Sequence, residues 1–187
     1  MESQAAAGEA LFDLIAGVDA RVVARAPRLP QQAPPVGRWA GLLFRVSELH
    51  LLAALDQIAE VLSVPSDLTA LPGTKDWVLG VANNRGTLLP IFDLAALTNG
   101  GVPTRRDADR VLVVRQEGAP CGLVVSEVIG IRHLVVSQRL AAAPAGLGVL
   151  GPLVQAAFPL AGGVVPVIAL ERLLSGPLMG VGVGVTT

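Results

Sequence analysis

The sequence contains few of the residues from which nucleic-acid surfaces are built. Aromatic residues make up 3% of its 187 residues, and Tyr is absent. Bases would therefore find almost no side chains on which to stack. The net charge is −1 at pH 7, without the basic excess that a nucleic-acid-binding domain carries. These absences argue against a nucleic-acid partner.

Residues for catalysis and metal binding are equally scarce. The single cysteine, Cys121, can form no internal disulfide and cannot alone make a Cys-rich zinc site. No His or basic residue stands near it to activate a thiolate, so we predict an inert core thiol. The two histidines, His50 and His133, have no carboxylates at metal-ligand spacing, and Asp93 is interpreted as a helix N-cap. We therefore predict no enzymatic activity, no metal and no cofactor.

Charge is also sparse, which raises the question of a membrane segment. Charged residues make up 16% of the chain, hydrophobic residues 52%, and the mean hydropathy is +0.60. The segment Leu140–Leu170 contains no charged residue. Four prolines interrupt this run, with glycines between them: Pro144, Pro152, Pro159 and Pro166. Each would cost a helix about 3 kcal/mol, so the run is predicted to form strands. The start has no basic segment typical of a secretory signal, and we expect a cytoplasmic protein.

Three parts can be distinguished along the chain. Residues 1–37 combine an amphipathic helix with a Pro-rich linker that begins at Pro27. The apolar stripe of that helix consists of Leu11, Leu14, Ile15, Val18 and Val22. Residues 38–175 form the main domain, and residues 176–187 are expected to be a flexible tail. Two interpretations of the helix stay open: docking on the main domain, or contact with a partner.

The main domain has the texture of short strands separated by turns. Apolar runs of a few residues alternate with Gly, Pro, Asp and Asn clusters. The predicted strands are Gly41–Val46, Leu49–Leu55, Ile58–Val64, Val78–Val81, Leu88–Phe92, Val111–Arg115, Cys121–Val125, Val128–Leu134, Val149–Val154 and Val164–Ile168. Hairpin turns are predicted at Ser47–Glu48 and Glu117–Gly118, and helical turns after Asp93 and at Leu170–Leu174. This pattern favours a mainly β fold of closed small barrels, which leave no long exposed edges.

An internal repeat relates the two halves of the main domain. Three pairs of segments can be superimposed in the same order: Leu42–Val46 on Val111–Arg115, Val78–Gly80 on Val149–Gly151, and Leu88–Leu97 on Val164–Leu173. A unit of this size is marginal alone, so two units are expected to pack across an apolar seam. Pro90 and Pro166 coincide in the repeat, and a proline inside a strand indicates an edge or a bulge.

One polar island interrupts the apolar texture. Asn83–Gly86 separates two predicted strands, and Arg85 is its only charge. Arg often anchors interfaces, so this turn is a candidate contact for a partner as well as a solvated loop.

The residues around this island resemble the CheW family of chemotaxis adaptors. Leu71–Leu94 is similar to the signature run of the family, with Gly-Val-x-Asn-x-Arg-Gly followed by Pro-x-x-Asp-Leu. Ala108–Val114 and Gly122–Gly130 resemble its second hairpin. The N-terminal helix, the linker and Lys75–Val78 look most like the pilus-chemosensory member of the family. The resemblance departs at Asn84, where the family usually has Leu, and at Ala169, where it often has Asp.

The resemblance implies a fold, a function and a set of contact residues. The fold would be two small five-stranded SH3-like β-barrels, interleaved and sharing a hydrophobic core. The function would be a non-catalytic adaptor between a methyl-accepting chemoreceptor tip and the regulatory domain of a CheA-type histidine kinase, controlling type IV pilus twitching motility. Partner contacts would fall on Ile58, Glu60, Gly80 and Arg85. The alternative is a structural subunit of a pilus or membrane complex without kinase coupling.

Overall fold

The computed structural model describes residues 37–99, 106–115, 120–141 and 144–175. The chain divides into two units, residues 1–35 and residues 36–187. All described residues belong to the second unit. The predicted N-terminal helix, Pro-rich linker, flexible tail and Glu117–Gly118 turn lie outside the described residues.

Ten strands and a few short helices make up the described chain. In order they are β1 (Arg38–Val46), β2 (Leu49–Ala54), η1 (Leu55–Gln57), β3 (Ile58–Ser63), β4 (Val78–Asn84), β5 (Thr87–Asp93), α2 (Leu94–Asn99), β6 (Arg110–Val114), β7 (Cys121–Val125), β8 (Glu127–Val135), η2 (Val136–Gln138), η3 (Gly148–Leu153), β9 (Val154–Leu160), β10 (Gly163–Ile168) and α3 (Leu170–Ser175). The η elements are 3₁₀ helices. The mainly β fold class is confirmed, and so are the Ser47–Glu48 turn and the two predicted helical turns.

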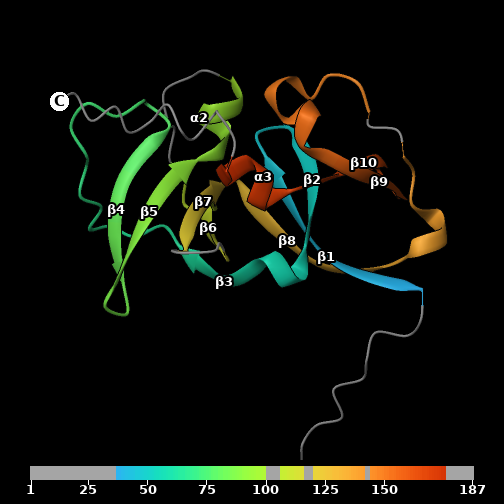
Figure 1. Cartoon of the computed structure of the whole chain (residues 1–187), viewed down its shortest axis with the longest axis horizontal. Coiled ribbons are helices and arrows are strands. Elements are labelled where there is room, and N and C mark those ends of the chain that lie inside the picture. The colour runs from blue at the N-terminus through green and yellow to red at the C-terminus, as the bar shows by residue number, and fades with distance from the viewer. Residues whose placement is uncertain (1–36, 100–105, 116–119, 142–143, 176–187) are drawn as a thin grey trace, which may run out of the picture. The chain divides into compact units, whose positions relative to one another are not determined.

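The strands form two five-stranded sheets, which stand side by side in Figure 1. Sheet A has the order β8-β1-β2-β10-β9, and sheet B has the order β3-β6-β7-β5-β4. Neighbours are antiparallel except β2 with β10 and β5 with β7. Among the described strands, β8 does not pair with β9, nor β3 with β4. The two five-stranded units of the expected fold are thus confirmed, and among the described strands no hydrogen-bonded ladder closes either sheet into a barrel.

The sequence repeat does not coincide with the two sheets. The first half of the chain supplies β1–β5 and the second half supplies β6–β10. The β1–β2 hairpin nevertheless joins the sheet of β8, β9 and β10, and the β6–β7 hairpin joins the sheet of β3, β4 and β5. The first hairpin of each half is thus part of the sheet formed by the other half's remaining strands. Neither sheet can form from one half alone.

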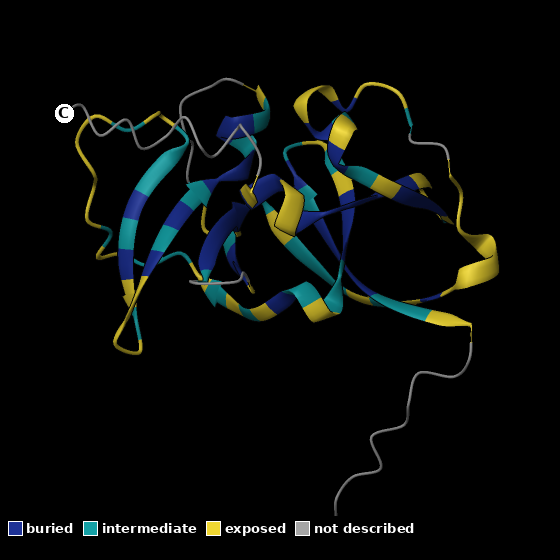
Figure 2. Ribbon diagram, viewed as in Figure 1, coloured by how far each residue is buried: buried dark blue, intermediate teal, exposed yellow. Residues whose placement is uncertain are grey.

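This exchange gives the exchanged strands two buried faces, visible as dark blue in Figure 2. In β1, Leu42 and Phe44 face a large core between the sheets, while Leu43 faces a smaller core within sheet A. In β6, Leu112 faces the same large core and Val111 faces a second small core within sheet B. Strands buried on both faces read as unbroken apolar runs. The low charge content and high hydropathy follow from this arrangement.

One predicted strand is wrong. Val149–Val154 was expected to be a strand equivalent to Val78–Val81, but residues 148–153 form η3, and the strand β9 begins at Val154. The superposition of Val78–Gly80 on Val149–Gly151 is therefore wrong as well. Pro152 lies inside η3 and has no N–H to donate to a ladder. The superposition of Leu88–Leu97 on Val164–Leu173 corresponds to β5–α2 and β10–α3 in the structure.

The two repeated prolines occupy internal strands, not edges. Pro90 lies in β5 between β7 and β4, and Pro166 lies in β10 between β2 and β9. Each stands one residue before parallel pairing begins, at Ile91 and Val167 respectively. In the β4–β5 ladder the register shifts between Val78 and Gly80, just before Val81, the residue that pairs with Pro90. In the β9–β10 ladder the register shifts between Val167 and Ile168, just after Pro166. The bulge interpretation fits, and the edge interpretation is wrong.

No helix in the described part of the chain has the length and apolar character needed to cross a membrane.

Candidate partner-binding site

The predicted polar island forms the tip of the β4–β5 hairpin. Asn84 pairs with Thr87, and the two residues between them, Arg85 and Gly86, have φ of 53° and 85°. Positive φ at both central positions is the requirement of a type I′ turn, whose twist matches that of the flanking strands. The Gly86 N–H donates to Asn83 Oδ1 over 2.7 Å. The turn thus fixes the backbone from which Arg85 projects.

Arg85 is an uncommon residue for this backbone. The left-handed conformation costs a residue with a Cβ roughly 1–2 kcal/mol, a cost that Gly avoids. The side chain of Arg85 is 79% exposed, so burial of apolar surface does not offset this cost. A long charged side chain is therefore held at the hairpin tip in a backbone conformation that favours other residues.

Glu60 on β3 meets Arg85 across sheet B. Arg85 Nη2 donates to Glu60 Oε1 over 2.6 Å, although β3 and β4 are the outermost strands of the sheet. An ion pair this exposed contributes at most about 1 kcal/mol to folding. Its main effect is geometric, because it orients the guanidinium and leaves its remaining N–H groups toward solvent. The structure therefore brings together two of the four predicted site residues.

Exposed apolar side chains also occur on the elements that carry this ion pair. Leu88, which pairs with Asn83 in the hairpin stem, is 69% exposed. Val61, which follows Glu60 in β3 and so points to the opposite face of that strand, is 41% exposed. Leu88 has the highest exposure among the large hydrophobic residues described. Sequence reasoning missed both. The available signal was the Leu88–Leu89 pair, because adjacent residues of a strand point to opposite faces and Leu89 is the buried one.

Gly80, the third predicted site residue, has a structural role. It is buried with φ of 131°, and a Cβ placed on it would lie 2.2 Å from the Thr69 carbonyl oxygen. Thr69 and Val81 exchange two backbone hydrogen bonds of 2.9 Å across this approach. The segment before β4 thereby covers the outer edge of that strand, which would otherwise offer unpaired groups to other chains. Ile58, the fourth predicted residue, is 7% exposed within the large core.

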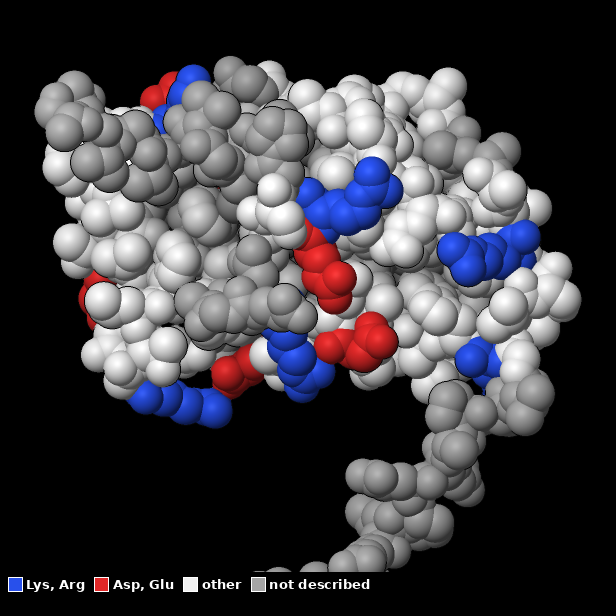
Figure 3. All heavy atoms as spheres, viewed as in Figure 1, with Lys and Arg blue, Asp and Glu red and all other residues white. Residues whose placement is uncertain are grey.

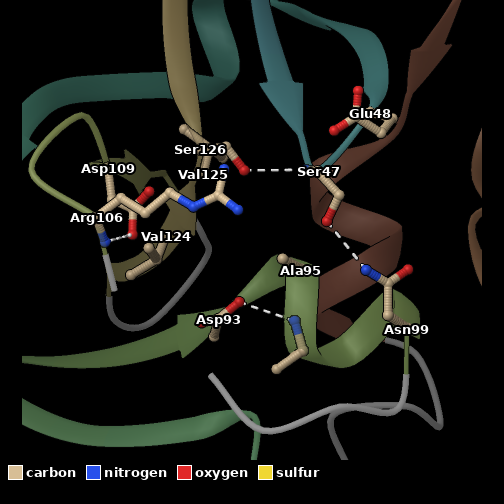
Figure 4. Close-up of a pocket in the computed structure, with 11 residues that line it drawn as sticks. Ser47, Glu48, Asp93, Ala95, Asn99, Arg106, Asp109, Val124, Val125 and Ser126 are labelled. Carbon is tan, nitrogen blue, oxygen red and sulfur yellow. Dashed lines mark hydrogen bonds between the residues drawn. The ribbon is translucent and has the colours of Figure 1, made fainter. Parts of the chain in front are cut away.

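A polar pocket of about 240 Å³ lies where the β1–β2 turn, α2 and the β7–β8 connection converge (Figure 4). Asp93 Oδ1 accepts from the Ala96 N–H over 2.8 Å, which confirms the predicted N-cap. Ser47 N–H donates to Ser126 Oγ over 2.9 Å, and Asn99 Nδ2 donates to Ser47 Oγ over 3.0 Å. These bonds join α2 to turns of both halves, so the pocket is explained as a structural junction.

The remaining candidates show no catalytic or metal-binding geometry. Burial raises the pKa of the Cys121 thiol to about 12, so the thiolate is negligible near neutral pH. His50 and His133 are exposed and lie opposite Arg45 and Ala40 on the two sides of β1. Five residues of a strand separate these positions by about 17 Å. Within the described ranges no group of three or more His, Cys, Asp or Glu is placed to hold a metal.

The comparison with protein families identifies the chain. Residues 40–177 match the CheW-like domain, and the chain belongs to this family. The resemblance predicted from the signature run and the second hairpin is therefore confirmed, and with it a place among chemosensory adaptors.

Individual relatives agree with this assignment. The chain is 37% identical to PilI of Pseudomonas aeruginosa over 147 residues, which covers 79% of this chain and 82% of PilI. It is 32% identical to FrzA of Myxococcus xanthus over 97 residues, covering 52% of this chain and 60% of FrzA. The fold is similar to that of the scaffolding protein TtCheW from Thermoanaerobacter tengcongensis, with a TM-score of 0.64 at 20% identity over 74% of this chain and 89% of that one.

Proposed function

We propose that this chain is a non-catalytic cytoplasmic adaptor that couples a methyl-accepting chemoreceptor to a CheA-type histidine kinase. Its similarity to PilI supports the proposal that this system controls type IV pilus twitching motility. The family implies both partners, the cytoplasmic tip of the receptor and the regulatory domain of the kinase. Neither metal, cofactor, nucleic acid nor membrane insertion enters the proposed function.

One observation carries the proposal: the oriented and exposed Arg85 at the tip of the β4–β5 hairpin. Its ion pair with Glu60 adds little to folding, and its backbone conformation is unfavourable for Arg. Folding therefore does not account for Arg at this position. An exposed guanidinium on the same hairpin as exposed Leu88 has the composition of an interface anchor, since Arg and large apolar groups are enriched where partners bind.

Glu60 and Arg85 are the proposed direct contacts. Ile58 and Gly80 act through position, because both are buried. Ile58 fixes the start of β3, from which Glu60 projects, and Gly80 admits the Thr69 segment that holds the hairpin stem. Substitutions at the two buried positions would displace the contacts without touching a partner.

Reconstitution from purified components tests this function. Full-length chain, kinase and receptor-tip fragment are mixed, and the material that co-purifies with the receptor fragment is measured with and without the chain. An adaptor brings the kinase down only when the chain is present, and Arg85→Asp abolishes this effect. Arg172→Asp, an equal reversal at an exposed residue of α3, leaves it intact. Retention of the chain in a pilus complex, with no kinase recruited, would favour the structural-subunit alternative.

A further inference from the structure

A second surface, remote from the Arg85 hairpin in the sheet order, surrounds the start of β1. A crevice of about 110 Å³ opens there between β1, β9 and the segment that follows β8. Trp39 forms one wall, Val136 and Phe158 line it, and Arg139 and Gln155 stand at it as polar groups. We call this the Trp39 crevice. All of its lining residues belong to sheet A or to the connection between β8 and β9.

The Trp39 crevice is a preformed feature. The Trp39 and Phe158 rings stack with centroids 5.3 Å apart and an interplanar angle of 13°. Gly41 makes room for this arrangement, because a Cβ there would lie 2.3 Å from the Trp39 ring. The Val136 N–H donates to the Gly37 carbonyl over 2.8 Å, and Leu140 pairs with Ala157. Both walls are therefore anchored to the sheet before any ligand arrives.

Two exposed apolar residues lie in or near this crevice. Val136 lines it and is 43% exposed. Leu140 is 40% exposed and pairs with Ala157, which stands between the lining residues Ala156 and Phe158. Exposed apolar side chains beside a concavity are typical of binding surfaces. A cavity of about 150 Å³ holds benzene, so the smaller crevice suits one aliphatic side chain.

The charged residue that lines the crevice is basic. Arg139 is exposed, and so is Arg38, which precedes Trp39 in β1 and therefore points to the opposite face of that strand. The ion pairs between described residues are Arg45–Glu127 and Arg85–Glu60, so neither Arg38 nor Arg139 has a carboxylate partner there. From Val128 to Leu170 the sequence contains no Asp or Glu. In Figure 3 the right-hand end of the molecule shows basic side chains, and the acidic side chains of this view lie toward its centre and left.

We propose that the Trp39 crevice binds an acidic peptide segment of a partner protein. One aliphatic side chain of the segment would enter the crevice between Trp39 and Val136. Carboxylates beside it would accept hydrogen bonds from Arg139, whose guanidinium group suits carboxylates. Within the described ranges the Arg139 side chain donates one hydrogen bond, from Nη2 to the Gln155 carbonyl over 3.3 Å, so most of its donors remain available there. A concave site can receive a side chain of a bound peptide. Binding to a membrane would instead require apolar side chains that protrude from the protein, so the crevice favours a peptide.

Tryptophan fluorescence of the full chain provides the test. The chain has two Trp residues, so Trp77→Phe leaves Trp39 as the reporter. The probe is a seven-residue peptide with a central Leu flanked by Asp and Glu. We expect a saturable change in emission that weakens as salt is raised. Arg139→Glu should weaken binding about tenfold, since it removes a charge-assisted contact and adds a like charge. Arg172→Glu, an equal reversal on exposed α3, should leave binding unchanged.

Two altered probes complete the design. A peptide with Ala in place of Leu should bind more weakly because the anchor is lost, and a peptide with Gln in place of its carboxylates should not bind measurably. Equal affinity for all three peptides, or for Arg139→Glu and the parent chain, would overturn the proposal. So would binding to phosphatidylserine vesicles without peptide binding. Arg85→Asp should bind the peptide normally, which separates this surface from the proposed kinase and receptor contact.

Discussion

Replacing Arg85 with Asp should abolish partner coupling while leaving the fold intact. On the folding side, the substitution removes the 2.6 Å ion pair with Glu60 and places a second carboxylate near it. The group is 79% exposed, so the loss should stay near 1 kcal/mol or below after solvent screening. Asp also tolerates a left-handed backbone better than most residues, which offsets part of that loss. The thermal midpoint should move by only a few degrees.

On the binding side the expected loss is much larger. If Arg85 anchors a partner, reversal leaves a wrong charge in a desolvated contact and costs roughly 2–5 kcal/mol. At 1.4 kcal/mol per factor of ten, this corresponds to a weakening of about thirtyfold to several thousandfold. A micromolar complex would then have a dissociation constant from tens of micromolar to millimolar. Isothermal titration of the variant against kinase and receptor-tip fragments measures this directly.

A charge swap separates the two roles that Arg85 can have. Arg85→Glu combined with Glu60→Arg rebuilds the intramolecular ion pair but presents the opposite charge at the hairpin tip. If the pair serves only to hold the hairpin, the swap restores binding. If Arg85 contacts a partner, the swap fails to restore it. Arg85→Asn, which suits the left-handed turn and adds no negative charge, should lie between the parent and Arg85→Asp. Parent affinity in Arg85→Asp, or complete rescue by the swap, would refute the reasoning.

Three further perturbations have defined outcomes. Gly80→Ala should lower the free energy of unfolding by roughly 2–4 kcal/mol in urea titrations, because the new Cβ meets the Thr69 carbonyl at a positive φ. The control, Gly86→Ala, has open space around it and should lower the free energy of unfolding by about 1 kcal/mol. Equal losses in the two variants would contradict this account. Burial raises the pKa of Cys121 from 9.0 to about 12, so deprotonation favours the unfolded chain above pH 9 and stability should fall between pH 9 and 12 more steeply than in Cys121→Ala; identical pH profiles would show that the thiol is not protected. Deletion of residues 1–36 should leave a cooperative thermal transition and a native near-UV circular dichroism spectrum, whereas a molten spectrum would place the N-terminal helix in the core.

Much of the strand pattern could be predicted because local periodicity reports local structure. Apolar runs bounded by turn residues predicted nine strands near their observed positions, including Ile58–Val64 against β3 (Ile58–Ser63). The exception, Val149–Val154, falls in the uncharged region, where apolar residues do not distinguish a strand from a 3₁₀ helix. There the backbone is decided by Pro152 and by the packing of Leu150 and Leu153 in the large core.

The amino-acid sequence by itself determined the mainly β fold class, the resemblance to the CheW-like family and the polar hairpin tip. Motifs, turn chemistry and strand periodicity are properties of residues that are neighbours in the sequence. Only the tertiary structure decided that each half lends its first hairpin to the other sheet, since a repeat is compatible with pairing within or between its copies. The same holds for the contact between Glu60 and Arg85, 25 residues apart, and for the burial of Ile58 and Gly80. This ion pair and this burial depend on how far the strands curve toward one another. The curvature is set by packing in three hydrophobic cores, each built from segments that are far apart in the sequence.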